Sequence, residues 1–194
     1  MIIRTVPVGE LQVNCCLISR DEASPLLVVD PGAEAEKLLK EINGRPVAAI
    51  LLTHGHFDHI GALDAFPDVP VYMHPLDAEM LSDPEKNGSR GMGGCEVIVC
   101  RETLPAEEGM TISLAGIDVT VWHTPGHSPG SVCYLTKECI FTGDTLFHRG
   151  YGRTDLFGGS FRDIRTSLKR ILFSGLDLPF IPGHGEGALL SDEK

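Results

Sequence analysis

Three histidines and an aspartate occupy the short run Thr53-His54-Gly55-His56-Phe57-Asp58-His59. The run follows directly on the apolar stretch of residues 47–52, which has the unbroken character of a strand covered on both faces. Imidazole nitrogens and carboxylate oxygens are the ligands that zinc and similar divalent metals prefer. This spacing therefore predicts a metal site at the point where a buried strand ends.

Further ligands are expected where a His or Asp ends a strand beside glycine or proline, because glycine permits the tight turns that aim a side chain into a shared site. Three residues answer this description, and a glycine precedes each of them: His127, Asp144 and His184. Together with the first run they give seven ligand-type side chains. Seven are too many for one tetrahedral site and suit two adjacent metals that share a carboxylate, so the residues favour a binuclear centre.

Hydrophobic periodicity and turn residues predict strands and helices in both halves of the chain, separated by a long irregular segment at residues 82–109. Two halves of similar order predict an α/β fold in one domain spanning residues 1–194, with two sheets packed face to face and helices outside. The expected strands are 2–8, 14–19, 26–29, 47–52, 69–73, 110–114, 117–122, 131–135, 139–142 and 178–181, and the expected helices are 33–42, 60–66, 75–81 and 161–173.

Charge and composition exclude several classes of protein. The formal net charge is -11, from 27 acidic and 16 basic residues, which argues against nucleic acid or an anionic membrane as a partner. No secretory leader pattern and no long apolar span is visible, so we expect a cytoplasmic protein, as a monomer or homodimer. The six cysteines form no CxxC pair, and we expect reduced thiols. Burial is expected for Cys15, Cys16, Cys133 and Cys139, whereas Cys95 and Cys100 stay open.

The pattern His-x-His-x-Asp-His, followed by a later His, Asp and His, resembles the metallo-beta-lactamase superfamily in its glyoxalase II-like branch. The stretches 123–131, 143–147 and 152–155 are similar to that branch as well. The resemblance implies a four-layer αββα sandwich of two mixed sheets and two divalent metals, zinc first, with iron or manganese as alternatives. It also implies that Asp30 supports the ligands from behind. By the same resemblance, one metal would take His54, His56 and His127 and the other Asp58, His59 and His184, with Asp144 bridging.

The chemistry expected from such a centre is hydrolysis. A metal lowers the pKa of coordinated water to about 7, so hydroxide can attack a carbonyl at neutral pH without a Ser or Cys nucleophile. The resemblance implies a thioesterase acting on S-2-hydroxyacylglutathione (S-lactoylglutathione) or a similar small thioester, with Asp58 and Asp144 as the catalytic carboxylates. This chain ends shortly after His184, where full-length glyoxalase II enzymes continue into a basic helical extension that binds glutathione. The thiol carrier is therefore expected to differ.

Other reactions remain open at this point. The first alternative is a mononuclear iron persulfide dioxygenase, although His184 would be superfluous to a single iron. The second is lactone hydrolysis, which would use the same attack. A non-catalytic metal-binding protein, beta-lactam hydrolysis and nuclease activity are the weaker alternatives.

Residues near the expected ligands could contact substrate or brace the site. We expect substrate contacts from Arg149, Tyr151 and His74, and a supporting role behind the ligands for His123. Arg153 and Asp155 are expected to pair and so brace their loop, whereas the sequence leaves His148 without a role.

Overall fold

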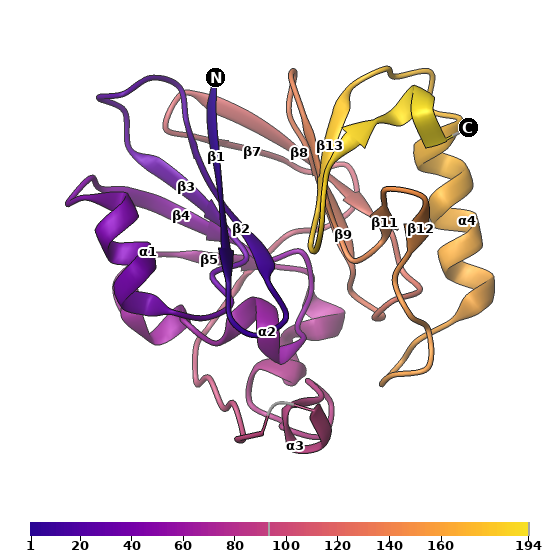
Figure 1. Cartoon of the computed structure of the whole chain (residues 1–194), viewed down its shortest axis with the longest axis horizontal. Coiled ribbons are helices and arrows are strands. Elements are labelled where there is room, and N and C mark those ends of the chain that lie inside the picture. The colour runs from indigo at the N-terminus through magenta and orange to yellow at the C-terminus, as the bar shows by residue number, and fades with distance from the viewer. Residues whose placement is uncertain (93, 194) are drawn as a thin grey trace.

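The computed structural model describes residues 1–92 and 94–193, in which two six-stranded sheets lie face to face (Figure 1). The sheet of the first half runs β1-β2-β3-β4-β5-β6, antiparallel from β1 to β3 and parallel from β3 to β6. Its strands are β1 (Ile2–Val8), β2 (Val13–Ser19), β3 (Leu26–Val29), β4 (Val47–Leu51), β5 (Val71–Met73) and β6 (Leu104–Pro105).

The sheet of the second half runs β14-β13-β10-β9-β8-β7, and only its β10–β13 pair is parallel among the described residues. Its strands are β7 (Thr111–Leu114), β8 (Ile117–His123), β9 (Val132–Leu135), β10 (Ile140–Gly143), β13 (Pro179–Pro182) and β14 (Ala188–Leu189). A separate antiparallel hairpin joins β11 (Leu146–Phe147) to β12 (Gly150–Tyr151).

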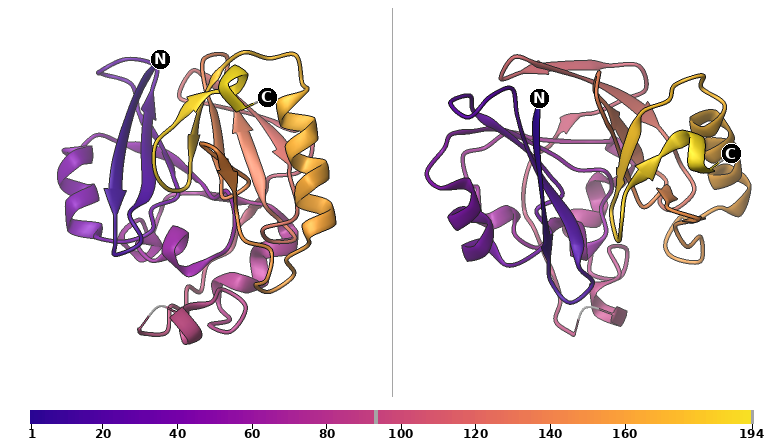
Figure 2. Two further views of the ribbon diagram at one scale, coloured as in Figure 1. Left: turned by 45° about the vertical axis from the view of Figure 1, so that its right-hand side comes forward. Right: turned by 45° about the horizontal axis from the view of Figure 1, so that its top comes forward.

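Helices lie on the outer faces of the sheets and below the ends of their strands (Figure 1). The α-helices are α1 (Ala35–Ile42), α2 (Phe57–Ile60), α3 (Ser89–Met92) and α4 (Phe161–Leu172), and the short 3-10 helices are η1 (Leu63–Ala65), η2 (Pro75–Leu81) and η3 (Leu190–Glu193). Helix α1 lies outside the first sheet, and α4 runs along the outside of the second (Figure 2). No helix in the described part of the chain is long and apolar enough to cross a membrane.

Alternating side chains of the strands build three apolar layers, which explains the four-layer order. In β3, Val28 packs toward α1 with Leu38, whereas the next residue, Val29, packs between the sheets. The layer between the sheets also holds Tyr134 and other side chains of the second sheet, and a third layer joins that sheet to α4. Strands buried on both faces read as continuous apolar runs, as β2 and β3 do. The predicted αββα sandwich of two mixed sheets is therefore confirmed.

Some element boundaries differ from the sequence expectation. The helix expected at residues 60–66 is broken: α2 begins at Phe57 and ends at Ile60, and a separate turn, η1, follows. The break falls at Gly61, where a Cβ atom would lie 2.4 Å from the carbonyl oxygen of Gly32, so the backbone passes too close for a side chain. The segment expected to be irregular contains α3 and β6, and its Asn87 side chain ties Met80 to Val97 through their carbonyl groups.

Candidate metal centre

The seven expected ligands come from the two sheets and meet where β4, β8, β10 and β13 end. His54 to His59 follow β4 and run into α2, which lies below the strand ends in Figure 1. The other ligands follow strands of the second sheet: His127 comes after β8, Asp144 after β10 and His184 after β13. Backbone bonds join the sheets here, because Asn14 N–H donates to the Gly183 carbonyl oxygen at 2.7 Å and Val132 N–H to the Thr53 carbonyl oxygen at 2.8 Å.

His54, His56 and His127 form the first ligand group, and all three are buried. Their ring nitrogens converge: His127 Nε2 lies 2.8 Å from His56 Nδ1 and 3.2 Å from His54 Nε2. His127 Nδ1 donates to the carbonyl oxygen of Arg153 at 2.8 Å, which leaves its Nε2 without a proton in the neutral ring. The sequence thus brings together three imidazoles from two loops that are 71 residues apart.

The second group consists of Asp58, His59 and His184, and Asp144 lies between the two groups. His184 Nε2 is 3.3 Å from Asp58 Oδ2 and 3.5 Å from Asp144 Oδ2. Asp144 also reaches the first group, because its Oδ2 is 3.4 Å from His127 Nε2. The positions of Asp144 and His184 therefore suit the shared carboxylate and the second-site ligand that the sequence predicts.

A buried hydrogen-bond chain behind the ligands fixes two of the rings. Asp30, which is 2 % exposed, accepts the Thr53 N–H at 2.8 Å, the Thr53 hydroxyl at 2.6 Å and His59 Nδ1 at 2.9 Å. Since the Thr53 hydroxyl donates to Asp30, its oxygen accepts from His54 Nδ1 at 3.1 Å. Both rings then turn Nε2 toward the centre, and this is the nitrogen that each ring can offer to a metal. Asp30 also has a φ of 49°, which a non-glycine residue adopts only where its surroundings hold it.

Among the described residues, the carboxylates around the centre raise the pKa values of two neighbouring histidines. Burial alone would lower the pKa of His59, but the carboxylates of Asp58, Asp30 and Asp144 raise it to about 9. Burial likewise opposes the rise of the His184 pKa, which hydrogen bonds to Asp144 and Asp58 raise to about 11. The half of the centre that contains the carboxylates thus attracts protons strongly, as a site built for a cation does.

The all-histidine half of the centre shows the opposite behaviour. Burial, and then the neighbouring rings, lower the pKa of His56 to about 3 and that of His54 well below its usual value. These rings therefore stay neutral, which is the form in which imidazole binds a metal.

Unpartnered atoms show that the residues fit metal ions. His59 Nε2 and Asp144 Oδ1 are buried and have no hydrogen-bond partner within the described chain, although buried polar atoms rarely lack one. The bare Nε2 atoms of His54 and His127 also face each other at 3.2 Å, so their lone pairs repel unless a cation lies between them. The donor set of imidazoles and carboxylates suits two divalent metals of the zinc, iron or manganese type.

Asp77 was not singled out by the sequence, yet it joins the two loops that carry the first ligand group. It is fully buried, and its carboxylate accepts the Gly55 N–H at 3.1 Å, the Gly130 N–H at 2.6 Å and the Ser128 hydroxyl at 2.6 Å. Burial raises the pKa of this carboxyl, against the hydrogen bonds, which lower it. The available signal was a carboxylate in the first turn of a helix at the end of a strand, which is common for structural reasons.

A glycine allows the close approach of two ligand loops. A Cβ atom on Gly183 would lie 2.1 Å from Asp144 Oδ1 and 2.8 Å from the His59 ring. The glycine before His184 is therefore needed for packing against the centre as well as for a turn.

The centre opens onto a cavity of about 270 Å³. Metal-ligand candidates form its floor, and Leu11, Phe57, Met92 and Leu156 form much of its wall. Arg153 also lines the cavity and pairs with Asp155 through two bonds of 2.7 and 2.8 Å, so the expected brace is present. Its guanidinium also lies 3.5 Å from the sulfur of Met92, across the cavity mouth.

The three expected substrate contacts lie elsewhere. His74 is stacked on His123 with ring centroids 4.1 Å apart and caps η2 by accepting the Leu76 N–H. Tyr151 is exposed on β12 near the Phe161 ring, and the Arg149 N–H donates to Glu193. None of the three lines the cavity at the centre in the described structure. The geometry gives no support to the predicted substrate contacts.

The other histidines have structural contacts. His123 Nε2 lies 2.9 Å from the carbonyl oxygen of Pro129, so it contacts the loop of His127 and not the ligand ring itself. His148 lies 2.6 Å from the carboxylate of Glu193 on the surface.

All six cysteines are unpaired. Cys15, Cys16, Cys133 and Cys139 are buried as expected, whereas Cys95 and Cys100 are exposed.

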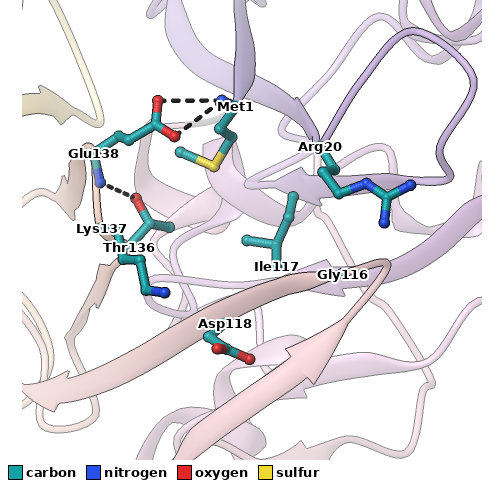
Figure 3. Close-up of a pocket in the computed structure, with 8 residues that line it drawn as sticks. All are labelled: Met1, Arg20, Gly116, Ile117, Asp118, Thr136, Lys137 and Glu138. Carbon is teal, nitrogen blue, oxygen red and sulfur yellow. Dashed lines mark hydrogen bonds and ion pairs between the residues drawn. The ribbon is translucent and has the colours of Figure 1, made fainter.

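A separate pocket of about 150 Å³ lies at the N-terminal end of β1 (Figure 3). There the N-terminal amine bonds the Glu138 carboxylate at 2.9 and 3.2 Å, beside the β7–β8 turn. None of its lining residues belongs to the described ligand groups. This pocket is therefore separate from the candidate metal centre.

Comparison with known proteins agrees with this geometry. A family model described as the metallo-beta-lactamase superfamily matches residues 8–188. The chain belongs to the metallo-beta-lactamase superfamily. Among curated superfamily members, it is 39% identical over 193 residues to the probable metallo-hydrolase YqgX of Bacillus subtilis, covering 94% of this chain and 89% of that protein. It is 33% identical over 204 residues to the hydroxyacylglutathione hydrolase GloC of Haemophilus influenzae, covering 100% and 95%.

Two solved structures of the superfamily are close to this one. BLEG-1, described as a B3 metallo-beta-lactamase, superposes with a TM-score of 0.91 at 35% identity, covering 99% of this chain and 96% of that one. TTHA1623 in a di-iron-bound form gives a TM-score of 0.86 at 39% identity, covering 98% and 96%. The glyoxalase II-like resemblance is confirmed, and the relatives together with the ligand cluster identify a metal-dependent hydrolase.

Proposed function

We propose that this chain is a two-metal thioesterase that hydrolyses small thioesters of 2-hydroxy acids, with S-lactoylglutathione among the candidates. One observation carries the proposal: two ligand groups share Asp144 at the floor of a cavity that no Ser, Thr, Cys or Lys lines among the described residues. The nucleophile would then be water, because the carboxylates and imidazoles that line the cavity would be engaged as metal ligands. The relationship to GloC, a hydroxyacylglutathione hydrolase by name, supports the thioester class.

One metal would be held by His54, His56 and His127. The other would be held by Asp58, His59 and His184, and Asp144 would contribute to both. When bound, the metals would lower the pKa of a coordinated water and polarise a carbonyl oxygen. Zinc fits the donor set and remains a proposal, as do iron and manganese, since a related structure is a di-iron form.

The chain's own residues position the reaction. The carboxylate of Asp58 is 14% exposed and lines the cavity, so it can accept a hydrogen bond and a proton from an attacking water. Attack forms the new C–O bond, and breakage of the C–S bond then releases the thiol arm as a thiolate. Thiols have a pKa near 8.5, so the departing sulfur needs little help from an acid, and none is needed from the apolar wall.

Turnover of a substrate panel by protein reconstituted with zinc, iron or manganese tests this proposal. The panel contains S-lactoylglutathione, a neutral lactoyl thioester, a lactone and a cephalosporin. Hydrolysis of the thioester, lactone or beta-lactam bond is followed, and the metal content per chain is measured in the same samples. We expect thioester cleavage with about two metals per chain. Cleavage of the lactone or cephalosporin alone would contradict the proposal.

The dioxygenase alternative predicts oxygen consumption with glutathione persulfide and a single iron per chain. His184 argues against it, since it completes a second ligand group that one iron would not use. Iron-dependent oxygen uptake without thioester cleavage would favour it.

A further inference from the structure

A second hollow of about 360 Å³ continues from the cavity at the metal centre, and we call it the side groove. It lies between the β1–β2 turn, the start of α2 and the segment after α3. It shares four lining residues with the cavity, namely Leu11, Phe57, Asp58 and Met92. A substrate whose carbonyl group lies at the metal centre can therefore extend past Asp58 into the side groove.

The walls of the side groove are apolar. Val8, Leu11, Ala33, Phe57 and Val97 line it, and Leu11 and Met92 are exposed at its edge. Exposed apolar surface beside a reactive centre is typical of a binding site for an apolar part of a ligand.

The charges of the side groove are all negative. Its charged lining residues are Glu10 and Glu34, besides the candidate metal ligand Asp58, and none of the described lining residues is Lys, Arg or His. Glu34 accepts the Gly9 N–H at 2.8 Å and faces Lys37 at 3.3 Å, on the surface. The Lys37 ammonium also donates to the Pro7 carbonyl oxygen, so it is already engaged outside the groove. A carboxylate or phosphate in the groove would find no cation and would face Glu10.

We propose that the side groove binds the thiol arm of the thioester, and that this arm is neutral or cationic and carries no carboxylate. The inference rests on the proposed thioesterase function and narrows its substrate class. A lactoyl group is small enough to stay at the metal centre, so the longer thiol arm is the part that needs the groove. The guanidinium of Arg153, which lines the adjoining cavity, is paired with Asp155 through its Nε and Nη2 atoms, and this carboxylate offsets its attraction for an anionic arm.

Cys95 provides a test that needs no catalysis. Both Cys95 and Cys100 are exposed, but only Cys95 lines the side groove among the described residues. The metal-loaded Cys100→Ser and Cys95→Ser variants each keep one exposed thiol in the described chain, and each is treated with a cationic and an anionic methanethiosulfonate at low salt. We expect the rate of labelling by the cationic reagent, divided by the rate for the anionic reagent, to be about fivefold higher at Cys95 than at Cys100. The ratio at Cys95 should fall when Glu10→Gln is added. Equal ratios at the two thiols would overturn the inference.

A substrate series with one acyl group tests the same inference in turnover. Lactoyl thioesters of glutathione, N-acetylcysteamine and thiocholine present an anionic, a neutral and a cationic arm to the metal-loaded enzyme. We expect kcat/KM at low ionic strength to be about tenfold higher for the neutral and cationic arms than for glutathione. Glu10→Lys should reduce this roughly tenfold difference in kcat/KM. Glu22→Lys makes an equal change of charge outside the groove lining and should not alter the difference.

The outcomes separate the two proposals. Preference for the glutathione thioester would overturn the side-groove inference while the thioesterase function stands. The inference would also be overturned if Glu10→Lys and Glu22→Lys changed the difference in kcat/KM between the arms to the same extent. Rates that depend on the length of the acyl group and not on the thiol arm would overturn it as well. Failure to cleave any thioester would overturn the function, and the inference with it.

Discussion

Replacement of Asp77 tests whether a buried carboxylate outside the ligand set holds the first ligand group together. Its two oxygens accept backbone N–H groups from Gly55, between two ligand histidines, and from Gly130, three residues after His127. A hydrogen bond to a charged group contributes roughly 1.5–3 kcal/mol, and a buried donor without an acceptor costs about 1–3 kcal/mol. Asp77→Ala leaves two such donors, so we expect the free energy of unfolding to fall by about 3–5 kcal/mol.

The milder variant Asp77→Asn keeps the volume but places an amide N–H₂ against one of the two backbone donors. We expect it to lower the free energy of unfolding by about 2 kcal/mol and the metal affinity by about 10–100-fold. Urea unfolding of the metal-loaded protein measures the first quantity, and competition with a chromophoric chelator measures the second. Asp64→Asn, at an exposed position, is the matched control and should change neither. An Asp77→Asn protein that is destabilised yet binds metal with unchanged affinity would refute the positioning role.

Three further predictions concern the centre itself. His59 and His184, with pKa values raised to about 9 and 11, hold protons near neutral pH in the metal-free protein, so metal loading should release about two protons per chain. Calorimetric titration in buffers of different ionisation enthalpy measures this release, and its absence would contradict the charge assignment. Gly183→Ala should reduce the metals bound per chain by elemental analysis, because its Cβ displaces the bridging carboxylate, whereas Gly91→Ala, in open space, should not. Asp30→Asn should weaken metal binding about 10–100-fold in chelator competition. Unchanged affinity would show that Asp30 is not what orients the His54 and His59 rings.

The clustering of the seven candidate ligands could be predicted because its signal is local. Four of the seven candidates lie within six residues of one another, and glycine marks each of the others at a strand end. The two sheets could be predicted for a related reason, since strands buried on both faces are long enough to show as apolar runs. Strands of two residues, such as β6 and β14, show no periodicity at all.

Long-range contacts could not be predicted in the same way. Asp77 and Gly130 are 53 residues apart, and nothing in either neighbourhood indicates the other. The substrate contacts expected of Arg149 and Tyr151 depended on which way a short hairpin turns. Neither residue lines the cavity in the described structure, whereas Arg153, two residues beyond Tyr151, does.

The candidate ligands come from opposite sheets, and bound metals would therefore have a mechanical role besides chemistry. His54 and His184 belong to the two halves of the chain, which are joined near the centre by a few backbone bonds. Ions bound between them would fasten one half to the other, and their binding energy would add to the stability of the closed sandwich. Loss of metal would then weaken the contact between the halves, and we expect the metal-free chain to be cleaved by proteases more readily than the metal-loaded one.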